Sequence, residues 1–534
     1  MHTSTIKDDP LFELVKSLSI VEKAYFRKFV TLHIKGGENN YVILFDVVEA
    51  MDSYEESAIK KELGPKNFPK QLHRVKNYLY HQILKSLRAY HSETTIDGQL
   101  KNTLRDVEIL YSKSLYQECE EQLNAARTLA YKYDKLTRII EILEWEIKLI
   151  PKDIGFEDQA NILHQLFKER RILLEQKFNL YQYELWFNKI YTLCKSNNKI
   201  RDPKQLEPWQ KIMSQDIFKD ESRALSFHAK VLFNFCWGIF YYSSGQWENV
   251  TRVVERRHEL LESRPDLLSD APHQYINVLG NMLTIQVNLS TILTTSSRAH
   301  ARGFHQTMKK LNKFGRSWTS VLESIEIDLR VFANSTVHEL GFHISRGEFK
   351  KAVKITRKTE KLMKDLSKKT GTSSELAFLY YSAYAHFGNG EYRKALKYIN
   401  YLLNNNYFAI RTDLQCFTRI LNLLIHYELD NIFVLENAVL HSRRFIKKKG
   451  LLFKYEKNIL SFFRRASLSK FDNTKSEVKG LLELRNKLLR AKETVYSTNF
   501  DEYHHFMWWI ESKLRAVPLS KIIKEGLRKS NSTI

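Results

Sequence analysis

The chain has 534 residues, of which 43% are hydrophobic and 27% are charged, with only 18 glycines and 9 prolines. This composition excludes a largely disordered or linker-rich chain. The 84 lysines and arginines exceed the 61 aspartates and glutamates, which gives a net charge of +23. Such an excess favours nonspecific contact with polyanions, although AT-rich coding, which enriches Lys, Asn, Ile, Tyr and Phe together, is the alternative explanation.

We expect a cytoplasmic protein without a transmembrane segment. The N-terminus has no basic stretch followed by an apolar run, so no secretory signal is visible. The longest apolar segment, residues 231–242, is shorter than the roughly 20 residues that a membrane helix needs. The cysteines lack Cys-x-x-Cys spacing, which is typical of reduced thiols in a cytosol; they are Cys119, Cys194, Cys236 and Cys416.

Residues 1–95 are predicted to form a small helical unit that contains a basic helix. Asp9 and Pro10 supply an N-cap and a first-turn proline, and Ser19 with Glu22 forms a capping box. The pattern predicts further helices over residues 40–51, 55–63 and 68–90. The polar, turn-rich segment 91–98 is the expected boundary.

From residue 100 to 470 the sequence predicts paired helices, and one hairpin signature recurs. The two copies place a turn glycine, an aromatic residue and an alanine at equal spacing: Gly347, Phe349 and Ala352, then Gly390, Tyr392 and Ala395. The copies are 43 residues apart, and the same step reaches Ala438. Self-similarity of this kind is typical of stacked supersecondary units.

The signature resembles the tetratricopeptide repeat. Ala383 and Ala395 match the small residues of that family, Tyr392 matches its aromatic residue, and glycine stands at the turn. The segment 237–250 resembles a second copy and 115–119 a degenerate one, whereas the 43-residue step exceeds the family's usual repeat of about 34 residues. The resemblance implies an all-α, right-handed α-solenoid of tetratricopeptide-like hairpins.

The whole chain is also similar to bacterial helical-repeat proteins that have a small N-terminal helical unit, a resemblance that implies no activity. Residues 474–534 are rich in aromatic side chains around Trp508 and Trp509. We expect them to form a C-terminal helical cap, because an end repeat needs a different outer face.

Three segments carry basic or polar side chains on one predicted helix face. Like charges four residues apart repel by about 0.2–0.5 kcal/mol per pair, so nearly acid-free faces favour binding of RNA or DNA phosphates. A solvated outer face is the alternative and the commoner case. The faces are Lys70, Arg74, Asn77, His81, Lys85 and Arg88; Arg298, Arg302, His305, Lys309, Lys313 and Arg316; and Lys350, Lys354, Arg357, Lys361, Lys364 and Lys368.

The sequence predicts neither a metal site, a cofactor nor a catalytic residue. His338 and His343 are five residues apart and fall on different helix faces, whereas zinc-binding pairs need four. His343 matches His386 in the repeat, which indicates a structural role. Phosphate-binding glycine loops and nucleophile elbows are absent from the sequence, so we expect no enzyme.

The leading hypothesis is a noncatalytic adaptor that binds a peptide or helix of another protein in a concave groove. The groove candidates are Tyr380, Tyr384 and His386; packing between helices is the alternative, favoured for His386. The second hypothesis is a nucleic-acid or ribonucleoprotein-binding protein that uses the basic faces, with residues 1–95 as a docking unit. An enzyme whose site is assembled from distant residues is the third.

Overall fold

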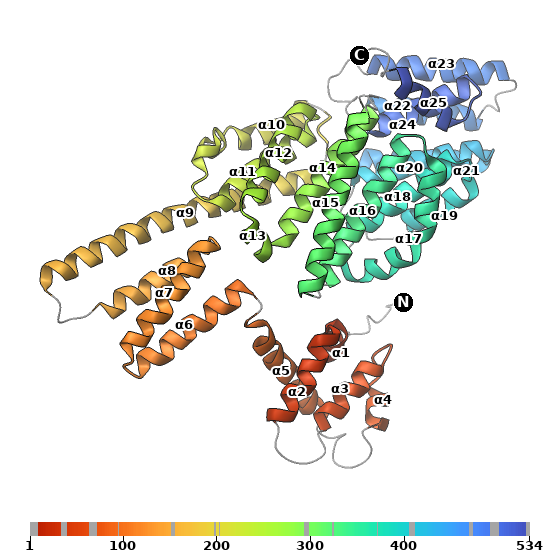
Figure 1. Cartoon of the computed structure of the whole chain (residues 1–534). Helices are drawn as coiled ribbons and strands as arrows, with labels where there is room; N and C mark the ends of the chain where they lie inside the picture. The colour runs from red at the N-terminus through yellow and green to blue at the C-terminus, as the bar shows by residue number, and fades with distance from the viewer. Residues whose placement is uncertain are drawn as a thin grey trace. The chain divides into compact units, whose positions relative to one another are not determined.

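The structure is a computed structural model that describes residues 9–33, 40–62, 72–93, 95–150, 155–196, 199–201, 203–292, 298–322, 325–370, 372–404, 412–468, 474–491 and 501–529. These residues form 25 α-helices and two short 3₁₀-helices, without a strand in the ranges given (Figure 1). Most consecutive helices pack against one another. The prediction of an all-α chain of sequentially packed helices is therefore confirmed. The chain divides into two compact units, residues 1–174 and 175–534.

The first unit begins with five helices that enclose a core of their own, in which Phe26, Phe45 and Leu79 are fully buried. Asp9 caps the first helix by accepting hydrogen bonds from two backbone N–H groups, at 3.0 and 3.2 Å. The predicted capping box is present, because the Ser19 N–H donates to the Glu22 carboxylate at 2.8 Å. The helices are α1 (Pro10–Ser17), α2 (Ile20–His33), α3 (Asn40–Ala50), α4 (Glu56–Glu62) and α5 (Leu72–His91).

Three further helices and the start of a fourth complete the first unit. Arg127 links three of these helices through ion pairs, since its guanidinium lies 2.6 Å from both the Glu146 and the Glu169 carboxylates. The helices are α6 (Ile96–Ser112), α7 (Tyr116–Lys132), α8 (Leu136–Leu149) and α9 (Phe156–Ser196).

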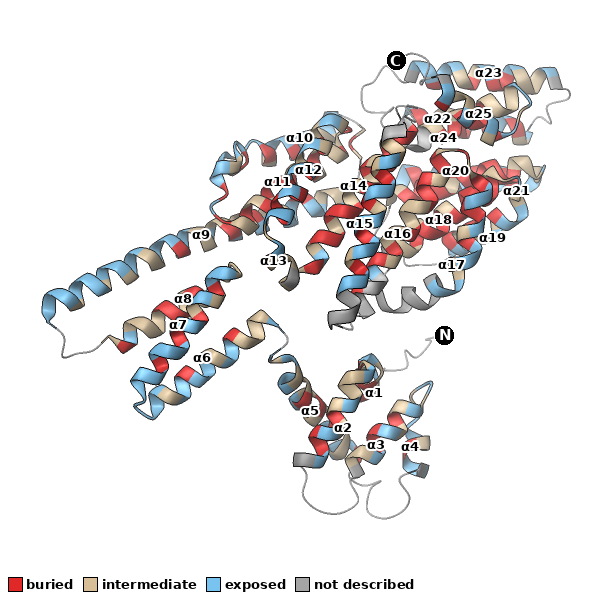
Figure 2. Ribbon diagram, viewed as in Figure 1, coloured by how far each residue is buried: buried red, intermediate tan, exposed pale blue. Residues whose placement is uncertain are grey.

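The second unit is built around five helical hairpins. In each hairpin the first helix is mostly buried and the second helix turns a charged face to solvent (Figure 2). The first helices are α11 (Phe227–Ser243), α14 (Pro272–Ile292), α16 (Ile325–Ser345), α18 (Thr372–Gly388) and α20 (Thr412–Glu428). The second helices are α12 (Trp247–Ser263), α15 (Arg298–Leu322), α17 (Phe349–Thr370), α19 (Tyr392–Asn404) and α21 (Ile432–Lys448).

The remaining helices of this unit are α10 (Pro203–Met213), α13 (Pro265–Asp270), α22 (Lys454–Leu468), α23 (Thr474–Ala491), α24 (Asp501–Leu514) and α25 (Leu519–Lys529). Helices α14, α16, α18 and α20 also pack against one another in that order, so the first helices form a continuous inner layer. No helix within the described ranges is long and apolar enough to cross a membrane.

One backbone motif ends eight helices of the described chain. In each, a residue with positive φ donates its N–H to the carbonyl three residues earlier, and the next N–H donates to the carbonyl five residues before it. This Schellman pair satisfies carbonyls that the helix leaves unbonded. The positive-φ residues are Ser114, Asp134, Gly245, Gly347, Gly390, Asp430, Gly450 and Ala516.

The fifth residue after the positive-φ residue is buried at seven of these eight turns, and it anchors the following helix. Ala352 and Ala395 hold this position in the signature, and both are fully buried. In the next hairpin the position falls on Leu435, 40 residues after Ala395, because the turn residue is Asp430. The predicted equivalence of Ala438 is therefore wrong: the 43-residue step does not continue.

Helix α24 lies against several hairpins rather than against the last one alone. Its His505 ring stacks on Tyr384 of α18, with centroids 4.5 Å apart. Trp509 donates its indole N–H to the Glu428 carboxylate of α20 at 2.7 Å. Helix α24 also contacts α14, so it joins three of the first helices.

Candidate functional site

A cavity of about 340 Å³ opens on the inner layer of the second unit, where α9, α11, α12, α14, α16, α18 and α20 contribute side chains. Its lining mixes apolar side chains with uncharged polar ones. The polar side chains include four amides and a threonine hydroxyl: Asn234, Asn281, Asn288, Asn334 and Thr284. The charged side chains in the lining are Lys199, Arg257 and Asp413.

The helices themselves hold three of the four amides in place. The side-chain NH₂ groups of Asn288 and Asn334 donate to the carbonyls of the residues four positions earlier, at 2.7 and 2.8 Å. Asn234 donates to the Lys230 carbonyl at 2.9 Å and to the Glu221 carboxylate at 2.9 Å. Back-bonding of this kind fixes the amide against its own helix. The amide of Asn281 has no partner among the described residues, so it is free to contact a ligand.

His338 forms part of the cavity wall and is neutral. Its Nδ1 lies 2.6 Å from the Asn334 carbonyl, and its Nε2 lies 2.8 Å from Oγ1 of Thr284. Burial lowers the pKa of His338 to about 4, so at pH 7 Nδ1–H donates to the carbonyl and Nε2 accepts from the hydroxyl. His343 lies instead beside the Glu348 carboxylate, at 2.7 Å.

Arg257 is the unusual residue of this site. Its side chain comes from α12, is 3% exposed and covers the Phe235 ring, with Cζ 4.0 Å from the ring centroid. Its Nε and Nη1 are buried without a hydrogen-bond partner, and none of the described carboxylates forms an ion pair with it. Burial lowers the pKa of Arg257 to about 10, so the guanidinium remains charged at neutral pH.

Arg257 is not among the site residues predicted from the sequence, although the sequence carries a signal for it. Val250, Val254, Arg257 and Leu261 follow one another at steps of four, three and four residues, which is the spacing of a buried helix face. All four are buried. A basic residue on such an apolar face is rare unless it is paired.

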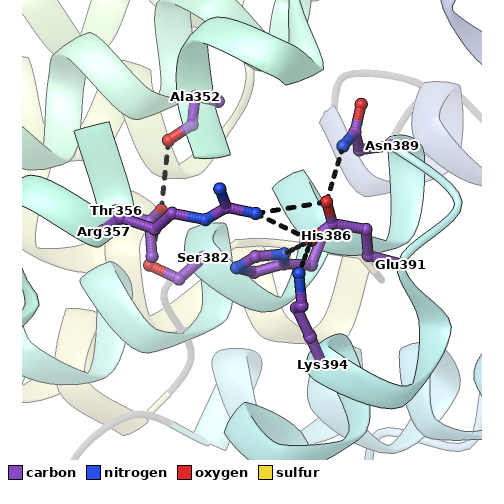
Figure 3. Close-up of polar contacts among 8 residues, drawn as sticks. All are labelled: Ala352, Thr356, Arg357, Ser382, His386, Asn389, Glu391 and Lys394. Carbon is purple, nitrogen blue, oxygen red and sulfur yellow. Dashed lines mark hydrogen bonds and ion pairs between the residues drawn. The ribbon is translucent and has the colours of Figure 1, made fainter. Parts of the chain in front are cut away.

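The predicted groove residues are largely taken up by packing. Tyr384 lies between Phe349 and His505, with ring centroids 6.2 and 4.5 Å away. His386 is 2% exposed and stacks on Tyr398, and its Nδ1 lies 2.7 Å from the Glu391 carboxylate (Figure 3). Tyr380 is also buried but lines the cavity, so it alone of the three stays a candidate contact.

The repeat positions have direct structural explanations. Gly347 and Gly390 adopt φ of +65° and +76°, which favours glycine. The Phe349 ring occupies the space that a Cβ at Gly388 would need, so helix α18 can end against α17 only with glycine there. Tyr392 packs on Phe387 across the turn, with centroids 5.5 Å apart.

The N-terminal basic face lies on α5 in the first unit. Arg74, Lys85 and Arg88 are exposed there, opposite the buried Leu79 and Ile83. Lys70, the fourth member of this face, lies outside the described residues.

The other two basic faces belong to a larger pattern in the second unit. Helices α15, α17, α19 and α21 together contain 22 lysines and arginines and three acidic residues. The first helices α14, α16, α18 and α20 together contain only two lysines or arginines and six acidic residues. The basic residues predicted from the sequence are exposed: Arg302 and Lys309 on α15, and Lys350, Lys354, Arg357 and Lys361 on α17. Arg298 begins α15, but its side chain is outside the described part.

The α15 face borders an open groove of about 580 Å³ beside α16. Lys309, Lys313 and Arg316 line this groove together with the Phe342 ring. Part of the charge on α17 is compensated locally, because Arg357 lies 3.3 Å from the Glu391 carboxylate. The second helices α15, α17, α19 and α21 are therefore strongly basic, whereas the first helices α14, α16, α18 and α20 carry few charges, most of them acidic.

No protein-family model matches this sequence, and comparisons with curated proteins and with solved structures find no significant relative, so the geometry of the two layers is the basis for any assignment.

Proposed function

We propose that this chain is a noncatalytic helical-repeat adaptor of the α-solenoid type, which binds a segment of a partner protein against its inner layer. The cavity lined by seven helices, α9 among them, is the observation that carries this proposal. Amide side chains both donate and accept hydrogen bonds, so they suit a peptide backbone, while Tyr380 and its apolar neighbours suit side chains. A cytoplasmic location fits this role, since the four cysteines are free thiols.

A variant that fills the cavity tests the proposal. A random peptide library displayed on phage is selected on the full chain, and the enriched peptides are measured by fluorescence polarisation. Asn281→Trp places a large side chain where the unpartnered amide stands, so it should abolish binding. Asn124→Trp makes the same change at an exposed site in α7 and should leave binding intact. Peptides that bind all three proteins equally would contradict the proposal.

A second candidate function is nucleic-acid binding by the outer layer. The observation that favours it is the excess of 22 basic over three acidic residues on α15, α17, α19 and α21. A cationic surface of this kind binds phosphates by releasing counterions, so its affinity depends steeply on salt. The ratio of absorbance at 260 and 280 nm before and after a high-salt wash is the first measurement.

Charge reversal then locates the binding face. The variant changes Lys309, Lys313, Lys350 and Lys354 to Glu. The slope of log affinity for duplex DNA against log salt concentration should become less steep by about 3 to 4, because each phosphate contact contributes about 0.9 to that slope. The matched variant reverses Arg74, Lys85 and Arg88 on α5. An unchanged slope in the first variant would show that the outer layer is a solvated surface.

A further inference from the structure

The guanidinium of Arg257 is a charge without a counterion inside a cavity. It is 3% exposed, stacks on Phe235 and has neither a hydrogen bond nor an ion pair among the described residues. Buried cations in proteins are ordinarily paired, because desolvation costs several kcal/mol per ion. The ring of Phe235 offsets only part of this cost, since a cation–π contact is weaker than a hydrogen-bonded ion pair.

The other ionisable groups of the cavity do not supply the missing partner. His338 is neutral, as its low pKa and its two hydrogen bonds require. Asp413 and Lys199 also line the cavity, but neither forms an ion pair with Arg257. The positive charge of Arg257 is therefore uncompensated among the described residues.

We infer that the cavity binds a carboxylate from the partner segment, supplied by an aspartate or glutamate side chain, and that Arg257 is its anchor. This inference rests on the proposed peptide binding. A carboxylate carries a single negative charge, which offsets one guanidinium, and it accepts charge-assisted hydrogen bonds from arginine N–H groups. The amide of Asn281 lies in the same lining and can form hydrogen bonds with the backbone of the segment.

The composition of the cavity favours a carboxylate over a phosphate group. A phosphate carries close to two negative charges at neutral pH, whereas Arg257 supplies a single positive charge. Much of the remaining lining is apolar, including Val254, Ile285 and Val287. A single negative charge on a short aliphatic stem fits this environment.

Peptide selection on two proteins tests the inference. The library is selected on the wild type and on Arg257→Gln, and enriched peptides are synthesised with their acidic residue intact or changed to the amide. On the wild type, the change from acid to amide should weaken binding by about tenfold or more, as expected for a charged hydrogen bond. On Arg257→Gln the same change should have little effect. Binders without a shared acidic residue, or an equal loss on both proteins, would overturn the inference.

A second measurement does not depend on peptide binding. Sodium acetate at constant ionic strength, with chloride as the balancing anion, should raise the unfolding temperature of the wild type but not that of Arg257→Gln, because a ligand stabilises only the state that binds it. An equal response of the two proteins would contradict a carboxylate site at Arg257. If cavity-dependent peptides are not found but acetate acts through Arg257, the peptide proposal fails while the anion site stands.

Discussion

Nδ1 of His386 lies 2.7 Å from the carboxylate of Glu391, across the turn that joins α18 to α19. The same contact joins His343 to Glu348 one hairpin earlier, also at 2.7 Å. In both turns the backbone N–H of the glutamate donates to the carbonyl of the histidine at 2.9 Å. In each turn, the side-chain contact and the backbone hydrogen bond therefore join the same histidine and the same glutamate. Figure 3 shows that Asn389, Lys394 and Arg357 also converge on Glu391.

The first prediction is that the second unit loses stability as pH falls below about 6.5. Burial lowers the pKa of His338 to about 4 and that of His505 to about 3. The unfolded chain takes up a proton near pH 6.5 at each histidine, and the folded chain does not, so acid favours unfolding. Each histidine contributes a loss of about 1.4 kcal/mol per pH unit within its window.

Urea unfolding at pH 7, 6 and 5 measures this dependence. His338→Gln should reduce the slope of stability against pH. Equal stability of the wild type at pH 7 and pH 5 would contradict the prediction.

The second prediction compares two glycines that share a conformation but differ in surroundings. Gly347 and Gly390 have φ of +65° and +76°, so alanine at either should cost about 1–2 kcal/mol from the backbone. A Cβ at Gly347 would also lie 2.9 Å from the Ser520 carbonyl, whereas a Cβ at Gly390 would meet no heavy atom within 4 Å. Gly347→Ala should therefore lower the unfolding temperature more than Gly390→Ala does, and a reversed order would be inconsistent with the packing of α25.

The third prediction concerns the position that anchors α19. Ala395 is fully buried, so Ala395→Trp should overpack the hairpin and lower the free energy of unfolding by roughly 1–3 kcal/mol or more. Lys397→Trp changes an exposed residue of the same helix and serves as the control. Chemical denaturation followed by circular dichroism gives both values. The repeat position is disproved if Ala395→Trp matches the control.

The fourth prediction is that Arg257→Met stabilises the unliganded protein. Methionine has a similar length and removes an unpaired buried charge, and replacement of buried charges by apolar side chains is often stabilising by about 1–4 kcal/mol. The unfolding temperature in chloride buffer is the measurement. A drop would indicate that the guanidinium already has a stabilising partner in the free protein.

Much of the fold follows from the sequence, because helix caps and amphipathic spacing are local. The Asp9 cap, the Ser19–Glu22 box and the buried Ala352 and Ala395 all lie where the sequence predicts them. The repeat was harder to follow, since only four of the eight positive-φ residues are glycines. A search for glycine turns therefore passes over Asp430, and with it the true register of α21.

The cavity was not predictable in the same way. Amphipathic spacing shows that a helix buries one face, but it does not show which other helix covers that face. It also does not show where two packed helices leave a cavity between them. Tyr384 illustrates the first point, because its partner His505 is more than 100 residues away in the chain. Arg257 illustrates the second, because its lack of a partner is visible only once every neighbouring carboxylate has been placed.

The contacts of α24 determine when the second unit can finish folding during its synthesis. Helix α14 has no charged residue of the Lys, Arg, Asp or Glu type, and both α14 and Tyr384 of α18 rest partly against α24. Translation proceeds from the N-terminus, so these surfaces stay open to water while all five hairpins have already left the ribosome. The inner layer is completed only after residues 501–514 have been synthesised, and a chain that stops before residue 501 lacks that cover.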